Sequence, residues 1–454
     1  MNPAANHCPL PKSAVWRFLS LYFHRKTALP NHRNTSSTPP HFPALRTGHR
    51  LLQRPSPGRP FPSNHRMKKH RVIESFCGAI VAFALFAETV PAADETQEGK
   101  PPAKESRLRM CPDFRADVNP LFYEKAPWEK TKKALSVFKL HIRMLNDSDE
   151  MPAAPGQEAW KKDWKLNVPQ MVQSLARDNI QLEIEAAGLY GAHTNETGRK
   201  SAEGELALIE RIYQAGGKVS YLMLDGPISR VIKGGRSKGV GGAEGTLNYN
   251  LEESVHHLVV YIQTVHARHP EIEIGLGVNL GWWDFQGQPA FMGTNSFSQS
   301  GYECNQVLDA VLAALVKAGE KITFIEADSP WDYMVVDKSP YHNKPVNETA
   351  KLLALEAYCK KKGLKFGYMI NSEARTTKDE PEFYNQTLDM LRRYHSARGR
   401  PDYYVVESWH AFTRTLLPED QAFSFTRLTR DFNRHLQGMD ATERKGTNQQ
   451  PDAY

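Results

Sequence analysis

The feature that most constrains the fold is a repeated alternation of strand-like and helical segments. Residues 322–328 illustrate the strand pattern, because Thr323, Ile325 and Ala327 fall on one face and Glu326 and Asp328 on the other. Seven such strand-like segments are found: 137–142, 180–187, 219–225, 272–280, 322–328, 366–371 and 403–409. Helical segments with apolar residues three or four positions apart follow them, at 169–177, 203–215, 251–268, 306–318, 348–362, 380–398 and 422–436.

A strand followed by a helix, repeated many times, implies parallel strands joined by crossovers. With this many units, the pattern predicts an α/β fold, a closed (β/α) TIM-type barrel rather than an open doubly wound sheet. Seven strands are clear, and the uncertain eighth is expected near residues 107–111. No glycine-rich phosphate-binding motif follows any strand, so we expect neither a nucleotide-binding sheet nor a cofactor.

The first part of the chain has the order of a secretory leader. Residues 1–66 hold ten Lys or Arg and no Asp or Glu. Residues 67–92 then have a basic start, an apolar core at 77–87 and a small-residue cleavage site, which is typical of a signal peptide. Because signal peptides begin a chain, we expect translation to start at Met67 and residues 1–66 to be an over-extended, disordered leader. A genuine basic arm is the alternative. This interpretation predicts a secreted or periplasmic protein.

The net charge and the cysteines exclude several partner classes. The formal charge is +7, and removing the +10 of residues 1–66 and the +1 of residues 67–92 leaves −4. We therefore expect no nucleic-acid partner, and the apolar run is too short for a stable membrane span. Three cysteines remain, Cys111, Cys304 and Cys359, so at most one disulfide can form. Their spacing does not predict a zinc site, and no metal site is expected.

These segments form one large domain with a polar segment at each end. We expect a linker and lead-in at residues 93–126, the barrel at 127–437 and a disordered tail at 438–454.

The candidate site follows from which face of each strand points inward. The outward face must be apolar to pack its helix, so in the second strand-like segment Leu182 and Ile184 point outward and Glu183 and Glu185 inward. The C-terminal strand ends, where such barrels place their active sites, carry the candidate catalytic carboxylates Glu185, Asp225, Glu326, Asp328 and Glu407.

Acids at neighbouring strand ends repel one another and need compensation or a use. For each of them, an internal ion pair is the alternative role. Lys139 and Glu183 lie early in their strands and fit such a salt-bridge network better than catalysis. His141 is expected near the acids, either as a substrate contact or as a hydrogen-bonded core residue.

Aromatic and amide side chains follow the same strand ends. Flat apolar rings beside carboxylates suit the faces and hydroxyls of a sugar, so we expect a poly- or oligosaccharide substrate. The candidate substrate-binding residues are His141, Asn279, Trp283, Trp331, Asn371 and Trp409.

At this level the chain resembles a known family. Over roughly residues 130–437, and through Val406-Glu407-Ser408-Trp409 in particular, it resembles the glycosidase-like TIM barrels of the large retaining glycoside hydrolase clan. The resemblance implies Glu407 as the nucleophile at the end of the seventh strand. The fourth-strand acid is absent, because Asn279-Leu280 stands where the clan has Asn-Glu.

Glycoside hydrolysis needs two carboxyls flanking one bond, one of them with a raised pKa. We therefore predict a secreted glycoside hydrolase-like protein with Glu407 as nucleophile or base and Glu326 as acid, Asp328 and Asp225 supporting them.

Two alternatives stay open. A sugar-binding barrel that has lost catalysis would explain the missing fourth-strand acid. A divalent-metal-dependent barrel enzyme acting on a sugar would use Glu185, Asp225, Glu326 and His141 as ligands, although histidines are scarce at the strand ends.

Overall fold

The computed structural model describes most of the chain beyond the predicted leader. Its described residues are 106–147, 164–190, 194–234, 248–293, 296–372, 377–409 and 412–447, the last six without side chains. The predicted leader, the signal peptide and the first part of the predicted linker lie outside the described residues.

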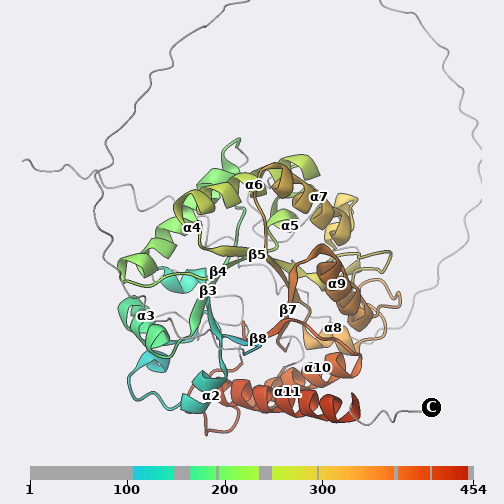
Figure 1. Ribbon diagram of the computed structural model, residues 1–454. Coiled ribbons are helices and arrows are strands. Elements are labelled where there is room, and N and C mark those ends of the chain that lie inside the picture. The colour runs from blue at the N-terminus through green and yellow to red at the C-terminus, as the bar shows by residue number, and fades with distance from the viewer. Residues whose placement is uncertain are drawn as a thin grey trace, which may run out of the picture. The chain divides into compact units, whose positions relative to one another are not determined.

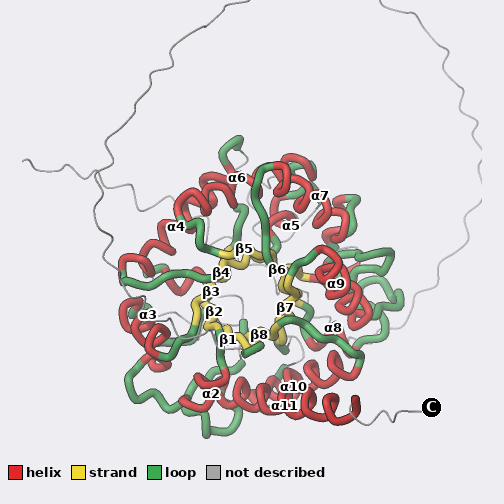
Figure 2. Tube along the Cα trace, viewed as in Figure 1, coloured by secondary structure: helices red, strands yellow, loops and turns green. Residues whose placement is uncertain are grey.

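Eight parallel strands close into a barrel in the order of the chain, as the view down the barrel axis shows (Figure 2). The strands are β1 (Leu108–Cys111), β2 (Val137–His141), β3 (Gln181–Ala186), β4 (Tyr221–Asp225), β5 (Glu273–Asn279), β6 (Phe324–Asp328), β7 (Lys365–Ile370) and β8 (Tyr403–Glu407). The predicted TIM-type barrel is therefore confirmed, and all seven predicted strands are present.

Helices surround the strand ring (Figure 1). They are α2 (Glu129–Ala134), α3 (Val168–Arg177), α4 (Thr197–Gln214), α5 (Pro227–Val231), α6 (Leu251–Arg268), α7 (Cys304–Lys317), α8 (Trp331–Val335), α9 (Glu348–Lys362), α10 (Glu380–Ser396) and α11 (Phe425–Thr447). Helices α6 and α9 begin and end where the sequence predicted. At the end of α9, Gly363 adopts a left-handed backbone with φ of 71°, which glycine allows without a Cβ clash.

The uncertain eighth strand is β1, and it comes first in the chain. It pairs with β2 on one side and with β8 on the other, so it closes the barrel. The barrel therefore begins at Leu108, inside the segment predicted as linker and lead-in, and each predicted strand number rises by one. Only four residues long, β1 shows too little alternation to be predicted with the others.

The end of the chain departs from prediction in the other direction. Helix α11 continues to Thr447, although a disordered tail was predicted from residue 438. Past Leu436 the helix is polar, which conceals its period, but Met439 packs against the core and Asp440 lies 3.4 Å from Arg107. Contacts with the barrel, invisible in a polar sequence, explain the difference.

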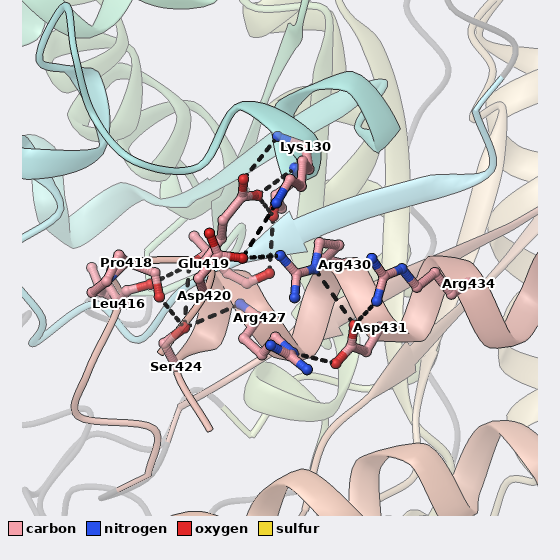
Figure 3. Close-up of polar contacts among 12 residues, drawn as sticks. Lys130, Leu416, Pro418, Glu419, Asp420, Ser424, Arg427, Arg430, Asp431 and Arg434 are labelled. Carbon is pink, nitrogen blue, oxygen red and sulfur yellow. Dashed lines mark hydrogen bonds and ion pairs between the residues drawn. The ribbon is translucent and has the colours of Figure 1, made fainter. Parts of the chain in front are cut away.

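Side chains of the loop before α11 bind both α11 and α2, the first α-helix of the described residues (Figure 3). Glu419 accepts hydrogen bonds from the backbone N–H groups of Lys130 at 3.1 Å and Thr131 at 2.9 Å. Asp420 pairs with Arg430 of α11 at 2.7 Å and with Lys130 at 3.4 Å. These contacts stabilise the N-terminus of α2, where carboxylates are favoured.

Most of the apolar core lies between the strands and the helices, and a smaller cluster fills the barrel itself. The inner cluster consists of Cys111, Met223, Phe324, Met369, Tyr403 and Val405. Cys111, Cys304 and Cys359 are all buried free thiols, so the single possible disulfide is not formed among them. Within the described ranges, no helix is both long enough and apolar enough to cross a membrane.

Candidate active site

A network of four charged residues crosses the barrel interior. Lys139 Nζ on β2 lies 2.5 Å from Glu326 Oε2 on β6 and 3.4 Å from Glu183 Oε1 on β3. Arg109 on β1 pairs with Glu183 and lies 3.5 Å from Glu326. Its guanidinium also stacks on the Tyr403 ring, 3.4 Å from the centroid. All four charged side chains are buried, so this lower layer is the internal salt-bridge network expected for Lys139 and Glu183.

The same network fixes the charge of Glu326. Burial acts to raise the pKa of this carboxyl, but the charges of Lys139 and Arg109 outweigh burial and lower it. For Lys139, burial acts to lower the pKa, and Glu326, Glu185 and Glu183 together raise it well above the ordinary value. The lowered pKa favours Glu326 as the ionised partner of two cations, whereas its predicted role as a proton donor requires a raised pKa.

Above this layer, Glu185 of β3 and Glu407 of β8 come together with Cys111 of β1. One ligand atom from each of the three lies within 4.8 Å of the other two, and all three residues are buried. Lys139 reaches this upper layer as well, with its Nζ 3.1 Å from Glu185 Oε2. The two carboxyls, which the sequence placed on strands distant in the chain, thus form a close pair.

Both carboxyls of the pair hold their protons unusually strongly. Burial, opposed by Lys139 and aided by Asp225, raises the pKa of Glu185 to about 7. Burial and the neighbouring Glu185 raise the pKa of Glu407 well above its ordinary value. Because two close carboxylates cannot easily ionise together, the pair titrates as one unit and holds a proton near neutral pH.

The two remaining candidate acids flank the pair with amide partners. Asn279 Nδ2 donates to Asp225 Oδ1 at 3.1 Å, and Arg230 of α5 pairs with the other oxygen of Asp225. Asn371 Nδ2 donates to Asp328 Oδ1 at 3.2 Å. Asn279 and Asn371, predicted as substrate contacts, therefore hold the Asp side chains in place.

His141 lies beside the pair, as expected. Its Nε2 is 3.7 Å from Glu185 Oε1, and its ring lies 5.0 Å from the Phe114 ring, centroid to centroid. Burial first, and then the charges of Arg143 and Lys139, lower the pKa of His141 well below its ordinary value. A neutral imidazole here offers a hydrogen bond without adding charge.

The three tryptophans are spread over different environments. Trp283 is buried in the core with its ring edge-on to Phe297, at 5.4 Å between centroids. The half-buried Trp331 donates its indole N–H to Asp389 of α10 at 2.9 Å. The backbone carbonyl of Trp409 accepts a hydrogen bond from Arg115. A position in a strand-exit loop thus did not mean exposure for Trp283, because its ring packs against Phe297 in the main core.

Sequence reasoning missed Arg109 and Cys111, the two inward residues of β1. The signal was present, since Leu108 and Met110 alternate with them and pack outward in the main core. A strand of four residues with an arginine in it did not reach the length at which alternation is informative.

Cys111, Glu185 and Glu407 are, within the described part of the chain, the one group whose atoms could converge on a metal ion. The donor chemistry fits poorly. A thiol must lose its proton to bind a metal, whereas burial and the charge of Glu407 raise the pKa of Cys111 well above its ordinary value. In addition, the Lys139 ammonium already neutralises Glu185.

The added first strand also changes the comparison with the retaining clan. Glu407 ends the eighth strand and not the seventh, and Asn279 ends the fifth and not the fourth. The fourth strand ends at Asp225, and the residue that follows the seventh is Asn371. Each strand number in the assignment from the resemblance therefore rises by one, as expected if the uncertain eighth strand lies near residues 107–111, and Glu407 no longer stands at the end of the seventh strand.

Comparison with known proteins finds no matching family model and no matching curated protein. Among solved structures, the chain is similar to an endo-β-1,6-glucanase at 9% identity, covering 66% of this chain and 65% of that one, with a TM-score of 0.39. It thus spans slightly less than two thirds of the glucanase. It is also similar to the catalytic domain of the Paenibacillus polymyxa β-amylase (8% identity, 67% and 93% covered, TM-score 0.41).

A third similar structure is the orotidine 5'-monophosphate decarboxylase of Sulfolobus solfataricus, at 9% identity with 74% and 99% covered and a TM-score of 0.32. Likenesses this distant, to proteins of different chemistry, carry no argument about function.

Proposed function

We propose that this protein hydrolyses a glycosidic bond of a poly- or oligosaccharide, with Glu185 and Glu407 as its two working carboxyls. One observation carries the proposal: at the C-terminal ends of their strands, one oxygen of the buried Glu185 carboxyl lies within 4.8 Å of one oxygen of the buried Glu407 carboxyl. Retaining glycosidases hold their carboxyl pair about 5–5.5 Å apart, and inverting enzymes hold it about 6.5–9.5 Å apart. The separation supports retention of configuration at the cleaved carbon.

The charges around the pair divide its roles. Lys139 lies against Glu185 and favours its ionised form, so Glu185 acts as the nucleophile. Burial and the charge of Glu185 raise the pKa of Glu407, so Glu407 acts as the acid that protonates the leaving oxygen. This division replaces the predicted roles of Glu407 as nucleophile and Glu326 as acid. Asp225 and Asp328 remain as the neighbours that complete the site.

Export is part of the proposal. A basic start, a short apolar core and a small-residue site at residues 67–92 support a secreted or periplasmic protein, a location in which polysaccharides are available as substrates.

The test is a substrate panel on the wild type, Glu185→Gln and Glu407→Gln. Each variant keeps the shape of the side chain and removes its acid–base function, so turnover on the cleaved substrate should fall at least about a hundredfold while the fold persists. Glu407→Gln should lose most on substrates with poor leaving groups, which depend on the acid.

The matched control is Glu356→Gln. Glu356 is a buried glutamate of α9 that accepts from Tyr394 and from the Arg400 backbone, outside the barrel interior. Its replacement should leave turnover intact. Sugar binding without hydrolysis by the wild type would contradict the proposal and favour a barrel that has lost catalysis.

A further inference from the structure

We propose that Lys139 is a positioning residue that decides which carboxyl of the pair carries the proton: it holds Glu185 ionised and leaves the proton on Glu407. The catalytic meaning of this device rests on the proposed function, but the proton's location is a property of the resting protein and can be measured without a substrate.

The geometry around the pair is asymmetric. Lys139 Nζ lies 3.1 Å from Glu185 Oε2. Among the described residues, Glu407 has no ion pair within 4.0 Å, although the charge of Lys139 also acts on it and lowers its pKa. Since the attraction between charges falls with distance and is strong in a buried site, Lys139 stabilises an ionised Glu185 more than an ionised Glu407. The asymmetry of the cation therefore assigns the proton.

Arg109, the other cation of the charged network, pairs with carboxylates outside the Glu185–Glu407 pair. Arg109 neutralises Glu183 and Glu326 in the lower layer. Glu326 thus keeps a counter-charge without Lys139, whereas among the described residues Lys139 is the one charged cation paired with Glu185, because the neighbouring His141 is neutral. A lysine that served only the lower layer would not need to lie against Glu185.

The charged and titratable groups that face the pair come from four other strands. Cys111 of β1, Lys139 and His141 of β2, Asp225 of β4, and Glu326 and Asp328 of β6 surround Glu185 and Glu407. Lys139 is the one group in this set that favours an ionised carboxylate over a protonated one by its charge, because His141 is neutral. Among the charges that act on Glu185, Lys139 is the largest and lowers its pKa, whereas at Glu407 the charge of Glu185 raises the pKa more than Lys139 lowers it.

The experiment titrates the carboxyl groups of wild type, Lys139→Met and Lys139→Arg, and it monitors them by NMR of glutamate-labelled protein. The variants Glu185→Gln and Glu407→Gln assign the signals. A cation within a few ångströms shifts a carboxyl pKa by about one to three units. Lys139→Met should raise the lower pKa of the pair by at least about one, which is a tenfold weaker acid. Lys139→Arg should return this pKa to its wild-type value.

Lys351→Met is the matched control. Lys351 is another fully buried lysine, paired with Glu348 at 3.2 Å and donating to the Leu280 carbonyl at 3.0 Å, outside the barrel interior. It should lose stability comparably and leave the titration of the pair unchanged. If Lys139→Met does not fold, Lys139→Met/Glu183→Gln removes one cation together with one carboxylate and keeps the buried charges balanced.

An unchanged pair titration in Lys139→Met or in the double variant would overturn the proposal and leave Lys139 a structural counter-ion. If the wild type is inactive but Lys139→Met still shifts the titration of the pair, the proposed function is wrong and this inference stands. In an active protein, the ascending limb of the pH–rate profile should move to higher pH in Lys139→Met, because Glu185 must ionise to act as nucleophile.

Discussion

Lys139 Nζ and Glu326 Oε2 lie 2.5 Å apart, although β2 and β6 stand on opposite sides of an eight-stranded ring. One ion pair thus spans the barrel and divides its interior. On one side of this ion pair, Arg109 and Glu183 pair with each other, so their charges are matched. On the other side, toward the C-terminal strand ends, Glu185 and Glu407 share a surplus of negative charge. The chemistry we propose depends on this division.

The first prediction concerns Glu326. Glu326→Gln leaves the buried Lys139 and Arg109 short of one counter-charge, and breaking a buried pair in this way costs about 3–5 kcal/mol. Denaturant unfolding should show a loss of that size, whereas activity per folded molecule should fall equally for good and poor leaving groups. A loss confined to poor leaving groups would return Glu326 to the role of acid.

The second prediction concerns pH. The folded pKa of Glu407 lies above its unfolded value near 4.5, so the folded state binds the extra proton and loses stability as pH rises above that value. Glu407→Gln has no proton to lose. Its free energy of unfolding, measured relative to wild type, should therefore increase from pH 5 to pH 8. A difference that stays constant over this range would show that Glu407 ionises as easily in the folded state as in the unfolded chain.

The third prediction tests the packing of the barrel interior. A Cβ at Gly275 would overlap the Phe324 ring, so Gly275→Ala forces the ring to move. Such overpacking typically costs about 1–3 kcal/mol. Gly438→Ala is the control, because a Cβ at this exposed α11 position meets nothing within 4 Å. Replacing a helical glycine by alanine stabilises by about 0.5–1 kcal/mol, so thermal unfolding should shift in opposite directions.

The fourth prediction concerns the start of the mature protein. If residues 67–92 are a signal peptide, N-terminal sequencing of the exported protein should begin near Ala93. Peptides from residues 1–66 in the secreted fraction would show that the basic leader is part of the product.

Local pattern was sufficient for much of the architecture. The helix of residues 251–268 and the strand that ends at Glu407 were predictable, because apolar period and burial on one face are properties of a few consecutive residues. The sequence placed β1 only as an uncertain eighth strand near residues 107–111, and it did not predict the polar end of α11. Four-residue β1 and the polar end of α11 owe their structure to β2, β8 and Arg107, partners that lie far away in the chain.

By itself, the sequence determined the parallel strand–helix order, the inward parity of Glu183, Glu185 and Glu326, and the gathering of acids at one end of the strands. Only the tertiary structure decided which acids meet. Glu326 lies against Lys139, and Glu185 lies against Glu407, because barrel closure brings β2 to face β6 and places β3 and β8 around one interior. A carboxyl's charge is set by its nearest neighbours across that interior, and the spacing of residues along a strand does not contain those distances.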